Sequence, residues 1–177
     1  MEDISLHVLD IAENSVRADA KKIEIVVTRD AERDLLLVEV IDDGRGMDAE
    51  TLASVRDPFF STKRKKTGLG IPLLAQAAEQ ADGKLTVDSA PGRGTKVAAA
   101  FRLKHVDRPS VGSLADTILT LIASHPDREY IYEEREGERS FRFDTRELKA
   151  ELDGVPITEP AVLAAIREML KENIRIV

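Results

Sequence analysis

The sequence of 177 residues contains no cysteine and no tryptophan, and only 4% of its residues are aromatic. Without cysteine the chain has no disulfide, no thiolate metal site and no cysteine nucleophile. The scarcity of aromatic rings also argues against the base-stacking surfaces that bind single-stranded nucleic acid. Any chemistry therefore depends on side chains with oxygen and nitrogen atoms and on the backbone.

Long apolar runs and excess positive charge are also missing. No apolar run approaches the roughly 20 residues that span a bilayer, and the acidic start of the chain is unlike a secretory signal. The formal net charge is −7; residues 1–104 hold 16 Lys/Arg against 18 Asp/Glu, and residues 105–177 hold 10 against 15. Because binding to nucleic acid requires a basic face, we expect a cytoplasmic protein without a membrane span and without a nucleic-acid partner.

The hydrophobic content of 42% and the charged content of 33% are typical of a globular protein. Over residues 4–103 the apolar spacing predicts the order helix, two strands, two helices, two strands. This order indicates an α+β fold, a two-layer sandwich whose mixed sheet is covered by helices on one face. A polar stretch over residues 104–110 follows, and then a helix, a hairpin and two more helices.

We therefore predict a first domain over residues 1–104 and a small α/β appendage over residues 105–177. The acidic character of the appendage suits a module that binds a partner or a second copy of the chain. A passive appendage that covers an open edge of the sheet explains it equally well.

The first predicted helix has apolar residues at helical spacing from Ile4 to Val16. Asp10 and Asn14 are four residues apart and lie on one face, where we expect them to need a polar partner because the helix is largely buried. Asn14 offers an oxygen to a hydrated divalent cation, Asp10 can hold a metal-bound water, and Arg17 can reach an anion. On this stretch alone, a half-buried helix with two surface polar residues is the better explanation.

A glycine-rich turn, Asp42-Asp43-Gly44-Arg45-Gly46, follows the second predicted strand. Glycines permit a close approach of the backbone to a ligand and allow positive φ. A carboxylate fixed at the end of a strand can accept a hydrogen bond from an exocyclic amine such as that of adenine. Taken alone, an ordinary glycine-rich turn is an equal alternative.

The tripeptide Gly68-Leu69-Gly70 opens a second apolar helix through about Ala81. Exposed amides at a helix N-terminus favour a phosphate group. The basic run Lys63-Arg64-Lys65-Lys66 leads into this position, which suits a lid over phosphates, although such a run is usually a solvated loop. Phe59-Phe60 can be core residues or part of the site, and Gly92-Arg93-Gly94-Thr95 can be a hairpin turn or a contact beside a nucleotide.

Taken in order, five motifs resemble the N, G1, F, G2 and G3 boxes of the GHKL superfamily, which includes DNA gyrase B, Hsp90, histidine kinases and MutL. They are Asp10-x-x-x-Asn14, Asp42-x-Gly44-x-Gly46, Pro58-Phe59-Phe60-Ser61-Thr62-Lys63, Thr67-Gly68-Leu69-Gly70 and Gly92-x-Gly94-Thr95. The resemblance covers residues 4–103 and implies the Bergerat ATP-binding fold, with ATP and Mg²⁺ as ligands. The third motif is closest to that of the histidine-kinase catalytic domain.

By this resemblance, Asn14 ligates Mg²⁺, Asp42 accepts from the adenine amine, and Asp10 takes the position of the general base. The implied nucleotide-binding residues are Asn14, Arg17, Asp42, Gly44, Gly46, Met47, Phe60, Thr62, Lys63, Thr67, Gly68, Leu69, Gly70 and Thr95. Two departures matter. Asp10 is one methylene shorter than the glutamate of the hydrolytic members, which puts its reach to an attacking water in question, and Lys66 replaces the first glycine of the G2 box.

Histidine kinases carry an acceptor histidine in a helical hairpin before this domain, whereas the N box here begins almost at Met1. None of His7, His105 and His125 is assigned a catalytic role. We therefore expect a stand-alone, kinase-like phosphotransferase that acts on a separate protein, as the anti-sigma-factor serine kinases of the superfamily do. The alternatives are an ATP-dependent binding switch and a weak ATPase, and a homodimer is compatible with either.

Overall fold

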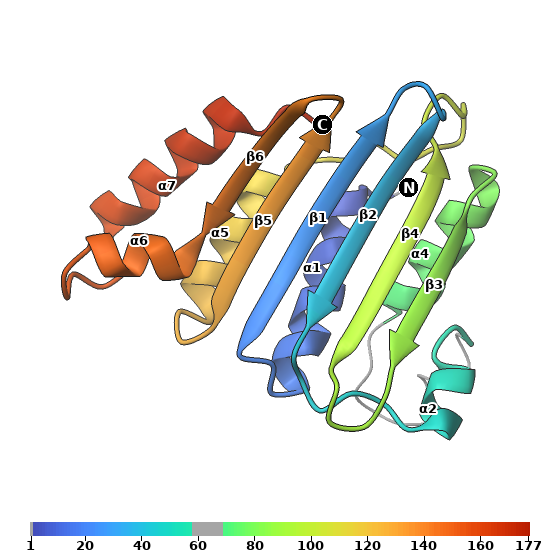
Figure 1. Ribbon diagram of the computed structural model, residues 1–177, viewed down its shortest axis with the longest axis horizontal. Coiled ribbons are helices and arrows are strands. Elements are labelled where there is room, and N and C mark those ends of the chain that lie inside the picture. The colour runs from blue at the N-terminus through green and yellow to red at the C-terminus, as the bar shows by residue number, and fades with distance from the viewer. Residues whose placement is uncertain (1, 58–68) are drawn as a thin grey trace.

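The computed structural model describes residues 2–57 and 69–177. Within them, six strands form one sheet in the order β3-β4-β2-β1-β5-β6, and helices α1, α4 and α5 lie behind it in the view of Figure 1. Only β1 and β5 pair in parallel; the other neighbours are antiparallel. The predicted α+β fold, with a mixed sheet and helices on one face, is confirmed.

The elements in chain order are α1 (Ile4–Arg17), β1 (Lys22–Asp30), β2 (Leu35–Asp42), α2 (Ala49–Ser54), α4 (Gly70–Gln80), β3 (Lys84–Ser89), β4 (Thr95–Arg102), α5 (Leu114–Ser124), β5 (Glu129–Glu136), β6 (Arg139–Asp144), α6 (Thr145–Glu151) and α7 (Pro160–Asn173).

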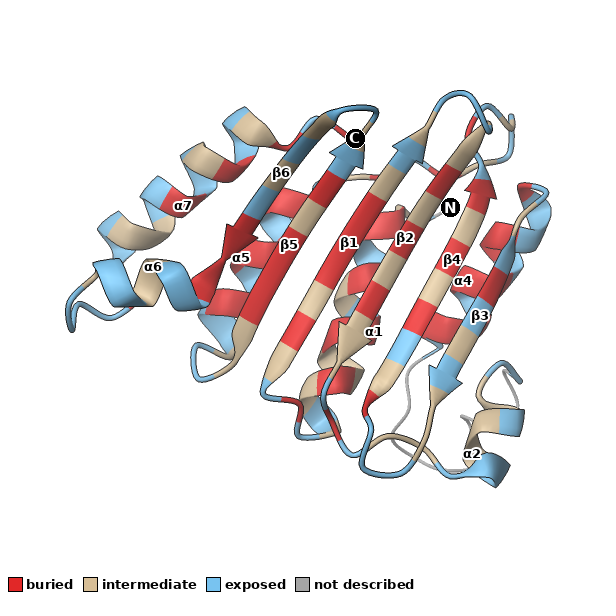
Figure 2. Cartoon of the chain, viewed as in Figure 1, coloured by how far each residue is buried: buried red, intermediate tan, exposed pale blue. Residues whose placement is uncertain are grey.

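The core lies between the sheet and the helices, as the burial colours of Figure 2 show. Every second residue of β2 from Leu36 to Val40 is buried, as expected for a strand with one covered face. On α1, Ile4, Val8 and Ile11 point toward the sheet at helical spacing and are at most 3% exposed. The longest helices in the ranges described have 14 residues, and none is long and apolar enough to cross a membrane.

Helix α4 ends at Gln80, close to the predicted end at about Ala81, and the two residues that follow Ala81 have different roles. Asp82, not Gly83, has the left-handed conformation, with φ of 53°. Gly83 is required for another reason: a Cβ atom there would lie 1.8 Å from the carbonyl oxygen of Ala100. The glycine therefore permits close packing of the α4–β3 connection on β4.

The predicted appendage, residues 105–177, continues the same sheet. Strand β5 pairs with β1 over eight residues, and one hydrophobic cluster includes Val8 of α1 together with Leu114 and Ile118 of α5. The backbone amides of Ile4 and Ser5 donate to the carbonyl oxygens of residues 110 and 111 at 3.0 and 2.8 Å. The appendage thus covers one edge of β1 and shares the core, while its role in binding a partner or a second copy stays a prediction.

Candidate nucleotide-binding site

Three polar residues form a row at the end of the sheet where β2 and β3 end and β4 begins. This is the lower end of the sheet in Figure 1. Asp42 at the end of β2 is directly opposite Thr95 at the start of β4, and Thr95 is directly opposite Ser89 at the end of β3. Residues paired in this way point to the same face of a sheet. Because Val40 and Val97, two residues away on the same strands, are buried, this row lies on the face that the helices cover.

The carboxylate of Asp42 is fixed by three donors. Its Oδ1 atom accepts from the backbone amides of Gly44 at 2.9 Å and Thr95 at 3.2 Å, and its Oδ2 atom accepts from the hydroxyl of Ser15 at 2.5 Å. A carboxylate accepts about four hydrogen bonds in total, so Asp42 can accept one more from a ligand. This geometry suits the predicted contact with an adenine amine.

Ser15 is a site residue that the sequence motifs do not identify. It is 3% exposed on the inner face of α1, and its hydroxyl also lies 3.2 Å from the carbonyl oxygen of Ile11. Buried hydroxyl groups usually have a hydrogen-bond partner. In the sequence, the one indication of this role is that a serine occupies the apolar face of the helix directly after Asn14.

The two glycine-rich turns lie against each other beside this row. Gly46 and Gly94 have φ of 71° and 73°. A Cβ atom would lie 2.0 Å from the carbonyl oxygen of Ala90 if added to Gly46, and 1.9 Å from that of Asp42 if added to Gly94. Only glycine fits both positions, because each combines positive φ with close backbone contact.

The opposite side of the site is formed by α1 and the start of α4. Gly70, the first residue of α4, is buried beside Asp10: a Cβ atom added to Gly70 would lie 2.8 Å from the Cβ atom of Asp10. Leu69 is exposed directly before the helix. The positive end of the α4 dipole thus lies next to the residues of the N box, where it favours an anion.

Asn14 and Arg17 are already in contact. The Nη1 atom of Arg17 donates to Oδ1 of Asn14 at 2.8 Å, and Asn14 is half-buried. The predicted need of Asp10 for a polar partner is wrong, because Asp10 is exposed and the cost of burying an unpaired carboxylate does not arise.

Five of the predicted nucleotide-binding residues lie outside the described residues. They are Phe60, Thr62, Lys63, Thr67 and Gly68. Met47 is placed: its backbone amide donates to Ser89 Oγ at 2.9 Å, next to the glycine turns.

The residues present suit a magnesium ion only if phosphate oxygens also bind it. In residues 2–57 and 69–177, no group of three or more acidic or histidine side chains gathers as a metal site. Mg²⁺ is commonly held by one or two protein oxygens, with phosphate and water oxygens completing its shell. Asn14 Oδ1, on α1, is a side-chain oxygen that can supply one such ligand.

Two of the histidines, His7 and His125, have defined surroundings in the fold. His7 is 4% exposed, and burial lowers the pKa of its imidazole although the charges of Glu2 and Asp10 oppose this shift. His7 is therefore neutral near pH 7. His125 Nε2 lies 3.1 Å from the carboxylate of Glu13 and connects the end of α5 to α1.

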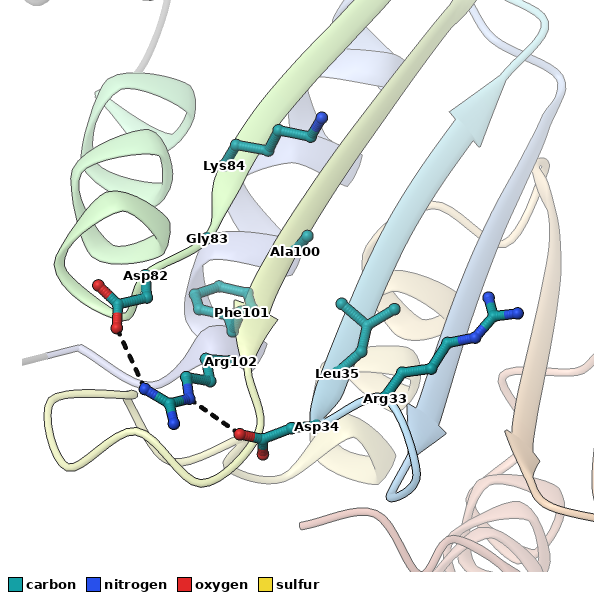
Figure 3. A pocket seen from close by; sticks show the side chains of 9 residues that line it. All are labelled: Arg33, Asp34, Leu35, Asp82, Gly83, Lys84, Ala100, Phe101 and Arg102. Carbon is teal, nitrogen blue, oxygen red and sulfur yellow. Dashed lines mark hydrogen bonds and ion pairs between the residues drawn. The ribbon is translucent and has the colours of Figure 1, made fainter.

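A shallow hollow of about 410 Å³ lies at the other end of the sheet (Figure 3). The β1–β2 turn, the α4–β3 turn and the end of β4 form its walls, and Arg102 donates there to Asp34 and Asp82. The lining residues include none of the predicted nucleotide-binding residues that the structure describes.

Comparison with known families agrees with the fold. Residues 2–105 match the family of histidine kinase-, DNA gyrase B- and HSP90-like ATPases. The match spans more than half of the chain, and the chain belongs to this family. It is a histidine-kinase-like ATPase domain with the ATP-binding fold of that family.

Several of the curated relatives that the chain resembles are named as kinases and are longer than this chain. The chain is 31% identical to sporulation kinase C of Bacillus subtilis over 96 residues, which are 54% of this chain and 22% of that protein. It is 37% identical to the sensor histidine kinase ZraS of Klebsiella oxytoca over 87 residues, 49% of this chain and 19% of that protein. It is 41% identical to the sensor protein kinase FleS of Pseudomonas aeruginosa over 88 residues, 50% and 22% of the two chains. The chain thus spans about a fifth of each relative.

A solved structure supports the fold over a longer stretch. The crystal structure of the N-terminal domain of a DNA repair protein superposes with a TM-score of 0.56 at 13% identity. The superposition covers 80% of this chain and 52% of that chain. Because 80% of the chain is more than residues 2–105, the likeness in fold includes part of the appendage.

Proposed function

We propose that this chain binds Mg²⁺–ATP between α1, the start of α4 and the row at the end of the sheet, and transfers the γ-phosphoryl group to a separate protein. The observation that supports binding most strongly is the carboxylate of Asp42, held by three donors beside two close glycine turns. An acceptor fixed in this way costs little further ordering when it meets the adenine amine.

The positions of the strand ends and of α4 indicate which end of the site would hold the phosphates. The row at the end of the sheet would hold the base, and the N-terminus of α4, at Gly70 beside Asp10, would face the phosphates. Asn14 would supply one oxygen to a magnesium ion that neutralises charge on the phosphates. Arg17 could then turn from Asn14 toward a phosphate oxygen.

Transfer to a partner is supported by the relatives, which are named as kinases, and by the exposure of Asp10. A nucleophilic oxygen or nitrogen of the acceptor would attack the γ-phosphorus, the bond to the β–γ bridging oxygen would break, and ADP would leave. Asp10 is exposed at this end of the site and can accept the proton of an acceptor hydroxyl.

The fate of the γ-phosphate tests this proposal. The protein is incubated with Mg²⁺ and γ-labelled ATP, with and without a lysate of the cells that encode it. We expect label on one discrete lysate protein, lost with Asn14→Ala and retained with Asn173→Ala, a matched change at the end of α7, which lies beyond the β6 edge of the sheet (Figure 1). Label released only as free phosphate would show an ATPase instead.

An ATP-dependent binding switch is the second candidate, and the contact between Arg17 and Asn14 favours it. Arg17 donates to the oxygen that we assign to the metal, so nucleotide binding would have to rearrange this surface pair. In the same experiment, a switch would leave the label on bound ATP, with no labelled protein and no free phosphate.

A further inference from the structure

The hydroxyl of Ser89 is at the centre of a hydrogen-bond network beside Asp42. Its Oγ atom lies 2.9 Å from the backbone amide of Met47, from the carbonyl oxygen of Gly94 and from Oγ1 of Thr95. An amide can only donate and a carbonyl can only accept. A serine hydroxyl has one proton to donate and two lone pairs that accept.

These constraints fix the direction of the bond between the two hydroxyl groups. Gly94 is buried, and a buried carbonyl without a donor costs about 1–3 kcal/mol. The proton of Ser89 therefore goes to Gly94, and its lone pairs accept from Met47 and from Thr95. The single proton of Thr95 is consequently directed at Ser89, and Thr95 has only lone pairs left for a ligand.

The neighbouring Asp42 also presents acceptors only, since an ionised carboxylate has no proton to donate. Its backbone donors and Ser15 hold it next to Thr95, whose own amide is one of those donors. The polar edge of the base site, formed by Asp42 and Thr95, thus offers acceptors without a donor.

We infer that Ser89 is a positioning residue for nucleotide specificity: by taking the proton of Thr95, it makes this edge select a 6-amino purine and reject a 6-oxo purine. This inference rests on the proposed binding of ATP. The amine of adenine can donate to both acceptors. Hypoxanthine would place its 6-oxo group, an acceptor, at the position of that amine, and its donor on this edge, N1–H, would lie one ring position away from them. An unpaired or repulsive polar contact of this kind discriminates strongly between otherwise similar ligands.

The test compares ATP with ITP, which differs from ATP in having the 6-oxo base hypoxanthine. Dissociation constants for both nucleotides with Mg²⁺ are measured by calorimetry on the full chain, its Ser89→Ala variant and a matched Ser140→Ala variant, changed at an exposed position on β6. We expect the wild-type protein and Ser140→Ala to favour ATP at least about tenfold. In Ser89→Ala the freed Thr95 hydroxyl can donate, so the ratio of the two constants should fall about threefold to tenfold.

The ratio separates specificity from a purely structural effect, because a distorted site weakens both nucleotides together. An unchanged ratio in a folded Ser89→Ala protein overturns the inference. If that variant does not fold, Thr95→Val serves instead: it should weaken ATP and leave ITP unchanged, and an equal effect on both overturns the inference. If the wild type binds ATP and ITP equally well, the inference about Ser89 is overturned and the proposed nucleotide binding stands. If the wild type binds neither nucleotide, the proposed function itself is overturned.

Discussion

At the scale of single residues, the site depends on the orientation of one carboxylate. Ser15 approaches Asp42 Oδ2 at 2.5 Å, and the backbone amides of Gly44 and Thr95 hold the other oxygen. The hydroxyl of Ser15 is the only side-chain donor among these three. Its contribution can therefore be removed without moving the backbone.

We predict that Ser15→Ala weakens ATP binding about threefold to tenfold, because one hydrogen bond to a ligand-binding carboxylate is worth about 0.5–1.5 kcal/mol. Calorimetric titration of ATP in the presence of Mg²⁺ measures the effect, with Ser140→Ala on β6 as the matched control. A folded Ser15→Ala protein with unchanged ATP affinity would show that Ser15 does not orient Asp42.

The sequence motifs predicted Asn14, Asp42 and Thr95 but not Ser15 or Ser89. Motifs mark residues that touch a ligand, whereas these two serines act on residues that would do so. Ser89 is six residues from Thr95 in sequence, and only the antiparallel register of β3 and β4 shows that they are opposite each other. The register of this hairpin depends on the geometry of its turn, which the pattern of residues 89–94 does not specify.

At the scale of elements, the hairpin turn between β3 and β4 depends on close backbone approach. Gly94 and Gly92 have nearly the same φ, 73° and 74°. A Cβ atom at Gly94 would meet the carbonyl of Asp42 at 1.9 Å, whereas one at Gly92 would meet nothing within 4 Å. Substitutions at these two glycines therefore separate the cost of backbone strain from the cost of a steric collision.

We predict that Gly92→Ala lowers the free energy of unfolding by about 1–2 kcal/mol, the usual cost of left-handed backbone for a residue with a Cβ atom. Gly94→Ala should cost clearly more and should also abolish ATP binding, because β2 and β4 must separate next to Asp42. Urea unfolding and ATP titration of both variants measure this. Equal stability of the two variants would contradict the close approach.

Helix α6 depends on a buried carboxylate at its N-terminus. Asp144 is 4% exposed, and its side chain accepts from the backbone amide of Arg146. Hydrogen bonds from the Arg146 side chain, followed by its amide and the charges of Arg146 and Arg142, outweigh the effect of burial and lower the pKa of Asp144 to about 2. The carboxylate therefore stabilises the fold in its ionised form.

Since this pKa is lower in the folded chain than in the unfolded one, the stabilisation is present above about pH 4 and is lost as the pH falls toward 2. We predict that Asp144→Asn removes about 2 kcal/mol at pH 7 and makes stability less dependent on pH in the acid range. Urea unfolding at pH 7, 5 and 3.5 measures both effects, with Asp153→Asn in the exposed α6–α7 loop as the control. An identical acid dependence in Asp144→Asn and the wild type would refute this role.

The sequence predicted most elements to within a few residues, but local sequence pattern did not predict the hydrogen-bond partners at the start of α1. Asp3 is at the N-cap position of α1 but makes no side-chain cap. Its carboxylate accepts from the hydroxyl of Ser110 instead, and the first amides of the helix donate to residues 110 and 111. These partners are about 107 residues away in sequence, so no local pattern indicates them.

At the scale of the whole molecule, the appendage contacts α1 along its length. Besides the bonds at the start of the helix, Thr117 on α5 donates to the carbonyl of Ser5 at 3.1 Å, and His125 meets Glu13 next to Asn14. The very end of the chain is also packed: the amides of Arg175 and Ile176 donate to buried Glu134. Although burial by itself raises the pKa of Glu134, hydrogen bonds from Arg139 and from these amides keep it below the usual value.

We predict that a chain ending at Lys104 does not fold into a stable domain. It would leave one edge of β1 unpaired and expose the side of α1 that packs on α5, where side chains such as Leu114 and Ile118 each contribute about 1.5–3 kcal/mol. Circular dichroism and thermal melting of this truncated chain test the prediction. A cooperative melt with ATP binding would show instead that residues 1–104 form an independent domain.

The central claim is that Asn14, Asp42 and the start of α4 form one Mg²⁺–ATP site, and metal-dependent binding tests it most directly. ATP affinity is measured by calorimetry with Mg²⁺ and with a chelator, for the wild type, Asn14→Ala and the Asn173→Ala control. We expect Mg²⁺ to strengthen binding to the wild type and the control at least about tenfold, or about 1.4 kcal/mol, and to have no such effect on Asn14→Ala. Unchanged Mg²⁺–ATP affinity in Asn14→Ala would contradict the site.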